Sequence, residues 1–189
     1  TEQQIAVAHD SIANDMVREL IVANNDDLKS QLSAANKKME EIKKMANTSS
    51  LYLSIIDIDP KMSAQQILPT ITDKYKGKAV LIDFWNTWCV PCRAAMSAIR
   101  PLKEQLHDVV YVYIADASSP VDKWGEMIKT ISGVHVRLTK EQAAALAEIH
   151  KLSGIPTYFV VNKEGKITYQ KTSFPGVETL REQLVSVMR

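Results

Sequence analysis

The spacing of hydrophobic positions changes near residue 50 and divides the chain into two regions. Residues 1 to 48 contain no Gly, Pro, Trp, Tyr or Phe. Their apolar residues recur every three or four positions, which is typical of amphipathic helices. One face carries Ile5, Ile12, Met16 and Leu20, and a second face carries Leu28, Leu32, Ala35, Met39 and Ile42.

We predict a two-helix appendage over residues 1–48. The polar run Asn24–Asp27 separates the two apolar faces, and either of its aspartates suits the N-cap of the second helix. The regular spacing lasts too few heptads for a dimeric coiled coil, so we expect the stripe to pack against the neighbouring helix or the main domain. Asn47–Ser50 is interpreted as a linker.

From residue 51 onward, apolar runs alternate with helical segments, which indicates a mostly parallel sheet covered on both faces. Ala79–Trp85 is apolar almost throughout and predicts a central strand, whereas Leu51–Ile58 alternates only loosely and predicts an edge strand or an extended lead-in. Thr139 and Gln142 form a capping-box pattern. Further strands are predicted at 109–115, 133–138, 158–161 and 167–170, and helices at 63–75, 90–106, 120–131 (capped by Ser118 or Ser119), 139–151 and 177–188.

Composition narrows the classes of partner. The formal net charge of +1 gives no reason to expect nucleic acid or an anionic membrane surface. No apolar stretch approaches the roughly 18 residues of a membrane span. The first residues show neither a basic nor an apolar leader region, so we expect any export signal to have been removed or never to have been there.

The two cysteines of the chain, Cys89 and Cys92, lie where the central strand ends and a helix begins. A sulfur at a helix N-terminus is stabilised as a thiolate, and a second sulfur one turn later is within its reach. The pair alone allows redox exchange, half of a zinc site, or two inert buried thiols. The histidines lack the spacing of zinc ligands, and the preceding strand and the following Pro91 favour redox exchange.

Two further residues fit such a site. Asp83 lies inside the central strand, six residues before Cys89. Burial would raise the pKa of its carboxyl group and let it accept the proton of Cys92, unless the strand lies at a sheet edge and Asp83 reaches solvent. Pro156 precedes a strand, and because only about one X-Pro bond in twenty is cis, frequency alone predicts a trans bond there.

The chain carries Asp83-Phe84-Trp85, followed by Trp88-Cys89 and Cys92, and Gly154-Ile155-Pro156-Thr157 opens a later strand. Together these motifs resemble the thioredoxin superfamily over residues 51–189. The Lys76–Lys78 lead-in and an inserted segment at 117–152 resemble the TlpA/ResA-like thiol:disulfide oxidoreductases, often grouped beside AhpC/TSA. The resemblance implies an α/β thioredoxin fold: a central mixed sheet flanked by helices, with a segment inserted after the second core strand, following the helical appendage.

The resemblance also implies roles for these residues. Cys89 would be the exposed nucleophile, Cys92 the buried resolving thiol and Asp83 the buried acid. Pro156 would be a cis-proline whose neighbouring backbone pairs with an extended substrate. The implied substrate contacts are Trp88, Val90, Pro91, Ile155 and Pro156.

Two positions depart from the family pattern. Many ResA-like proteins carry a Glu three residues after the second cysteine, where this chain has Ala95. The usual helix-kinking proline is replaced by Ser97, and Pro101 is a candidate to compensate. The missing Glu weakens any transfer of a cytochrome-maturation role.

The sequence and this resemblance therefore predict a thiol–disulfide oxidoreductase that reduces protein disulfides, needs an upstream redox donor and uses no cofactor or metal. We expect it in the periplasm, or otherwise exported or membrane-associated. One alternative is a thiol peroxidase, although Asn86 stands where peroxiredoxins need Thr or Ser. Another is a copper or zinc carrier with Met96 or His107 as an added ligand. In a third, the N-terminal helices contact protein partners and the redox site regulates them.

Overall fold

The computed structural model describes residues 15–48 and 53–189. The chain divides into two units, Thr1–Ile42 and Lys43–Arg189. This boundary falls a few residues before the predicted junction at 48–51. The predicted first helix lies mostly outside the described residues, as does the start of the predicted edge strand.

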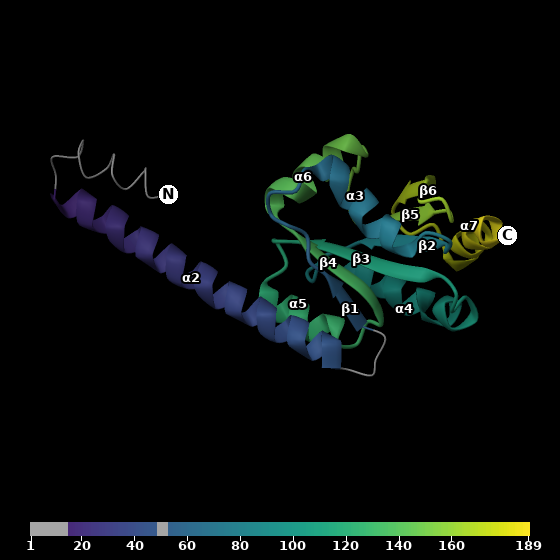
Figure 1. Ribbon diagram of the computed structural model, residues 1–189, viewed down its shortest axis with the longest axis horizontal. Helices are drawn as coiled ribbons and strands as arrows, with labels where there is room; N and C mark the ends of the chain where they lie inside the picture. Colours follow the sequence, from purple (N-terminus) through teal and green to yellow (C-terminus); the bar gives the residue numbers. More distant parts are fainter. Residues whose placement is uncertain (1–14, 49–52) are drawn as a thin grey trace. The chain divides into compact units, whose positions relative to one another are not determined.

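Helix α2 (Asp15–Thr48) is continuous through Asn24–Asp27, so the predicted break there is wrong (Figure 1). Asn and Asp are weak helix formers, but a helix of 34 residues without Gly or Pro accommodates them. The side chain of Gln31 donates to Asp27 Oδ2 at 2.8 Å, one turn away. The helix also includes Asn47 and Thr48, so the first half of the predicted linker is wrong.

The second apolar face of α2 is only partly buried. Leu28 and Leu32 of this face are exposed on the helix, and Leu20 of the first face is exposed as well. None of the described helices combines the length and the apolar character needed to cross a bilayer.

The described part of the second unit contains a six-stranded sheet in the order β1-β4-β3-β2-β5-β6. The first four strands run parallel, and β5 pairs antiparallel with both β2 and β6, which gives the predicted mixed sheet. The strand at the edge beside β4 is β1, as predicted. The strands are β1 (Leu53–Ile56), β2 (Val80–Phe84), β3 (Val110–Asp116), β4 (Gly133–Leu138), β5 (Thr157–Val161) and β6 (Ile167–Thr172).

Helices cover both faces of this sheet (Figure 1). Helix α3 packs against α6, and α4 packs against α7. Ile82 and Phe84 of β2 belong to the core shared with α3 and α6. Because side chains alternate along a strand, Asp83 points to the opposite face, beneath α4. The helices are α3 (Ala64–Thr72, followed by the short 3₁₀ helix η1, Asp73–Tyr75), α4 (Val90–Gln105), α5 (Val121–Ile128), α6 (Lys140–Ile149) and α7 (Val177–Met188).

The N-caps of two helices were predicted from the sequence, one correctly and one wrongly. The capping box of α6 is confirmed, since Gln142 N donates to Thr139 Oγ1 at 3.2 Å and Thr139 N donates to Gln142 Oε1 at 3.1 Å. The cap of α5 is Pro120, so the predicted cap at Ser118 or Ser119 is wrong. Both serine side chains bond instead to the loop that precedes the cysteines.

Gly133 at the start of β4 is a backbone constraint that positions the sheet. Its φ is 138°, and an added Cβ would lie 2.7 Å from the carbonyl oxygen of Tyr111. Gly133→Ala is therefore expected to lower the free energy of unfolding by about 1–3 kcal/mol. Gly154→Ala is the matched control, because its Cβ would meet nothing within 4 Å. Equal stabilities of the two variants in urea denaturation would contradict this assignment.

Candidate active site

The cysteine pair begins helix α4. Cys89 is the N-cap residue, and its sulfur accepts a hydrogen bond from Cys92 N at 3.2 Å. The backbone N–H of Cys89 donates to Asn86 O at 2.9 Å. Pro91 falls in the first turn, where an N–H has no helical partner to lose. The predicted placement of the first sulfur at a helix N-terminus is confirmed.

Cys89 and Cys92 form a disulfide, with their Cα atoms 5.3 Å apart. Cys89 is 3 % exposed and Cys92 is 0 % exposed. The prediction of an exposed Cys89 is therefore wrong for this disulfide form, because the N-cap sulfur is bonded to Cys92 and lies against the first turn of α4. The exposed groups are its neighbours, since Trp88 is 59 % and Val90 is 63 % exposed.

Asp83 is buried in the middle of the sheet. It is 2 % exposed, and β2 lies between β3 and β5, which rules out the sheet-edge alternative. Neither carboxyl oxygen has a hydrogen-bond partner among the described residues. Burial raises the pKa of Asp83 well above its ordinary value, and the positive charge of Lys103 opposes that shift.

Lys103 on α4 is the polar residue near Asp83 that sequence reasoning missed. Its amine donates to Tyr113 Oη at 3.0 Å and to Ser132 Oγ at 3.1 Å, and it also bonds Ser132 O. Tyr113 lies directly opposite Asp83 in the β2–β3 register. Burial lowers the pKa of Lys103 to about 8, with Arg100 adding to the effect and Asp83 opposing it. Helical spacing could have indicated this position of Lys103, because Lys103 follows the buried residues Cys92 and Ile99 along the same side of α4.

The tyrosines around Asp83 stay neutral. Burial raises the pKa of Tyr113, and the Asp83 charge adds to that shift. The same two causes, in the same order, raise the pKa of Tyr158. His135 is a core histidine: burial lowers its pKa to about 4, and its ring Nε2 bonds Ile131 O at 2.7 Å. The pKa of Asp83 is thus raised and that of Lys103 lowered, so the pKa values of this acid and this base shift toward each other.

The Ile155–Pro156 peptide bond is cis, as the resemblance implies, and the trans bond favoured by frequency alone is wrong. Thr157 pairs with Phe84 across the antiparallel β2–β5 register. Pro156 therefore precedes β5 at the end of the sheet where β2 leads into the cysteine loop. Ile155 and Asn86 line one cavity of about 150 Å³, which places the two loops side by side.

The remaining candidates are distributed over the α4 face. Met96 and His107, the proposed extra metal ligands, line a larger cavity of about 1270 Å³ together with Lys103. Across residues 15–48 and 53–189, no three His, Cys, Asp or Glu side chains are grouped to hold a metal ion. Ala95 is buried and Ser97 is exposed, with its hydroxyl donating to Arg93 O at 3.1 Å.

This fold and this cysteine pair define a thioredoxin-fold protein with a dithiol–disulfide site. The family described as Redoxin matches residues 34–184, and the chain belongs to that family.

Similar proteins carry related names. ResA of Geobacillus thermodenitrificans, a thiol-disulfide oxidoreductase, is 26% identical over 121 residues, which cover 62% of this chain and 67% of that protein. ResA of Bacillus subtilis is 27% identical over 49% of this chain and 51% of that protein. The thiol:disulfide interchange protein CycY of Rhizobium leguminosarum is 26% identical over 70% of both. The chain thus spans between about half and two thirds of the length of these ResA proteins.

Solved structures share the fold. A putative thiol:disulfide interchange protein DsbE from Chlorobium tepidum aligns with a TM-score of 0.52 at 20% identity, over 62% of this chain and 84% of that one. A DsbF homologue from Corynebacterium diphtheriae aligns with a TM-score of 0.53 at 22% identity, over 61% and 75%.

The buried carboxyl group generates a prediction about stability and pH. The pKa of Asp83 is raised above its ordinary value of 3.8, so the folded state holds its proton to a higher pH than the unfolded chain does. Its contribution to stability is complete below pH 3.8 and is lost as the pH rises through the folded pKa. In the wild type, the free energy of unfolding should fall by up to about 1.4 kcal/mol per pH unit as the unfolded chain releases this proton before the folded state does. Asp83→Asn has no such proton and should not show this fall.

The measurement is denaturant unfolding of the disulfide form at several pH values. The difference in unfolding free energy between Asp83→Asn and the wild type should grow with pH. Asp108→Asn, an exposed carboxylate on the same unit, should run parallel to the wild type. A pH-independent difference for Asp83→Asn would contradict the raised pKa.

Proposed function

We propose that this protein is a thiol–disulfide oxidoreductase that reduces disulfides in protein substrates. The observation that carries the proposal is the Cys89–Cys92 disulfide at the N-terminus of α4, with the carboxyl group of Asp83 buried in the strand beneath that helix. Membership of the Redoxin family and similarity to proteins named thiol-disulfide oxidoreductases support it.

In the first step, the thiolate of Cys89 attacks one sulfur of a substrate disulfide. A mixed disulfide forms with Cys89, and the other substrate sulfur leaves as a thiolate and takes up a proton. The N–H of Cys92 and the dipole of the 16-residue helix α4 stabilise the attacking thiolate. We assign the attack to Cys89 because it is the N-cap residue of α4 and lies between the exposed residues Trp88 and Val90, whereas Cys92 lies inside the helix.

In the second step, Cys92 loses its proton and attacks Cys89 Sγ. The Cys89–Cys92 disulfide forms, and the second substrate sulfur leaves as a thiol, so two electrons and two protons pass to the substrate. We assign the proton of Cys92 to Asp83, because burial raises the pKa of this carboxyl group and so makes its carboxylate a stronger proton acceptor than that of an exposed aspartate. An upstream dithiol donor must then reduce the pair.

The substrate surface combines two loops. Trp88, Val90 and Pro91 are exposed around the buried disulfide. Ile155 and Pro156 precede β5 at the same end of the sheet. We propose that an extended substrate segment contacts the exposed side chains and pairs with the backbone next to Pro156.

We place the protein in an exported compartment, on the strength of its resemblance to the ResA group. Disulfides persist in such compartments, so disulfide-bonded substrates are available there. Detection of the native protein only in a cytosolic fraction would contradict this placement.

The function is tested with cysteine variants, since the chain has two cysteines. Cys89→Ser should abolish the reduction of insulin by the protein recycled with dithiothreitol. Cys92→Ser should form a mixed disulfide with the substrate that is stable on a non-reducing gel. Full insulin reduction by Cys89→Ser would contradict the proposal.

The direction of electron transfer is tested by the reduction potential of the Cys89–Cys92 pair. A value near −120 mV rather than about −270 mV would contradict the reducing direction.

Lys103 generates a separate prediction about the second step. Lys103→Met removes a positive charge that lowers the pKa of Asp83, so that pKa should rise further. The pH of half-maximal resolution of a preformed mixed disulfide should then move up by about one unit. Lys103→Arg keeps the positive charge, so its pH of half-maximal resolution should move less. Lys123→Met, at an exposed position, should leave that pH unchanged. An unchanged pH profile for Lys103→Met would exclude the assigned coupling.

A further inference from the structure

The loop between β2 and α4 is held by side-chain hydrogen bonds from the segment after β3. Asn86 is 3 % exposed, and its amide Nδ2 donates to Asp116 Oδ2 at 3.0 Å. Its Oδ1 accepts from Asp116 N at 3.0 Å and from Ser119 Oγ at 2.8 Å. One buried side chain therefore makes three hydrogen bonds to residues about thirty positions away.

The next two residues of the loop are tied to the same segment. Thr87 N donates to Ser119 Oγ at 3.0 Å, and Trp88 Nε1 donates to Ser118 Oγ at 2.9 Å. All three residues that precede Cys89 are thus bonded to the segment 116–119. We call this set of contacts, made by Asn86, Thr87, Trp88, Asp116, Ser118 and Ser119, the Asn86 network.

The segment 116–119 is itself anchored to the sheet. Asp116 Oδ1 accepts from Ser118 N at 2.7 Å, and Arg137 of β4 donates to Ser119 O at 2.9 Å through Nη2. Burial opposes the ionisation of Asp116, but hydrogen bonds from Ser118 and Asn86, and the charge of Arg137, outweigh it and lower its pKa. Asp116 is therefore an ionised acceptor, which makes the bond from Asn86 charge-assisted.

We propose that Asn86 and Asp116 are positioning residues that hold Cys89 at the N-terminus of α4 and thereby set the reactivity of its thiolate. Asn86 O fixes the Cys89 N–H, and Cys92 N reaches the Cys89 sulfur at 3.2 Å only while the loop keeps this position. If the loop is released, the thiolate loses that donor and part of the helix dipole. The significance of the inference rests on the proposed redox function.

The network permits a test by exchange of donor and acceptor. Asn86→Asp alone replaces the Asn86 Nδ2 donor with a carboxylate oxygen, which then faces the carboxylate of Asp116. Asp116→Asn alone must turn an NH₂ group toward either Ser118 N or the amide of Asn86, which puts two donors together. The double variant Asn86→Asp/Asp116→Asn reverses the direction of the mutual hydrogen bond, and every other contact keeps its acceptor.

The readout is the pKa of the Cys89 thiol, measured from the pH dependence of alkylation by iodoacetamide in the reduced protein. Both single variants should raise that pKa, with about fivefold slower alkylation at a pH below it, and the double variant should restore the wild-type value. A pure charge effect behaves differently. It raises the pKa in Asn86→Asp, which adds a negative charge, and lowers it in Asp116→Asn, which removes one.

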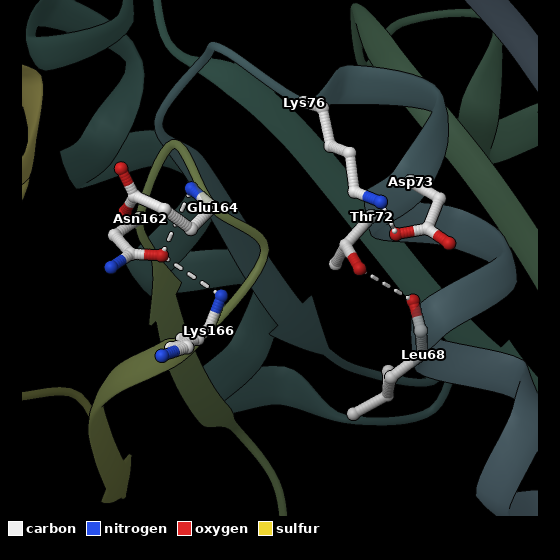
Figure 2. Close-up of polar contacts among 7 residues, drawn as sticks. All are labelled: Leu68, Thr72, Asp73, Lys76, Asn162, Glu164 and Lys166. Atoms are coloured by element: carbon white, nitrogen blue, oxygen red, sulfur yellow. Dashed lines mark hydrogen bonds and ion pairs between the residues drawn. The ribbon is translucent and has the colours of Figure 1, made fainter.

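Asn162 in the β5–β6 hairpin supplies the matched control. Its Oδ1 accepts from Glu164 N at 3.2 Å and from Lys166 N at 2.9 Å, as Figure 2 shows. Asn162→Ala should lower the melting temperature and leave the Cys89 thiol pKa unchanged. This control separates a general loss of loop contacts from an effect on the cysteine.

Three results would overturn the inference: opposite pKa shifts in the two single variants, no recovery in the double variant, or an equal shift in Asn162→Ala. If Asn86→Asp does not fold, Asp116→Asn compared with the double variant decides between the same outcomes. Failure of the proposed function is distinguishable, because the wild type would then not reduce insulin while the thiol pKa still responded to these variants.

Discussion

The carboxyl group of Asp83 in the central strand is the constraint on which the site depends. β2 is buried on both faces and between two strands, so Asp83 has no route to solvent. Burying an isolated charge is costly, and the neutral acid is the form that the strand favours. Lys103 reduces that preference without forming an ion pair, because its amine bonds Tyr113 and Ser132 instead. The result is a buried carboxyl group with a raised pKa in the strand beneath the helix that carries Cys92.

The sheet topology explains why separate parts of the chain meet at this group. β3 runs parallel to β2, so the segments that follow both strands leave the sheet at the same end. β5 runs antiparallel, so the segment that precedes it arrives at that end as well. The cysteine loop, the segment 116–119 and the Ile155–Pro156 turn are therefore neighbours although they lie far apart in the sequence. One mixed sheet thus brings Cys89, the segment 116–119 and the proposed substrate edge at Pro156 to the same end.

Features determined by nearby residues could be predicted from the sequence. The apolar run of β2, the capping box at Thr139 and the helix start at Cys89 each depend on residues within a few positions. The prediction failed where a residue distant in the sequence determines the hydrogen bonds of a side chain. Ser118 and Ser119 are good capping residues, but Trp88, Asn86 and Thr87 engage their hydroxyl groups. The hydrogen bonds of Lys103 and Asn86 could not be predicted for the same reason, since a lysine on a helix or an asparagine in a loop is ordinarily solvated.

In the proposed mechanism the two cysteines of the motif are controlled by different groups, and this asymmetry is absent from the sequence pattern itself. We propose that Cys89 depends on the α4 N-terminus and on the Asn86 network, which lie on the side of the exposed Trp88. Cys92 is completely buried, and we propose that it depends on Asp83 and, through it, on Lys103. On this proposal a change in the first set alters attack on the substrate, and a change in the second alters resolution. The balance between the two thiols, and hence the direction in which electrons flow, is therefore a property of the surrounding fold rather than of Val90 and Pro91 alone.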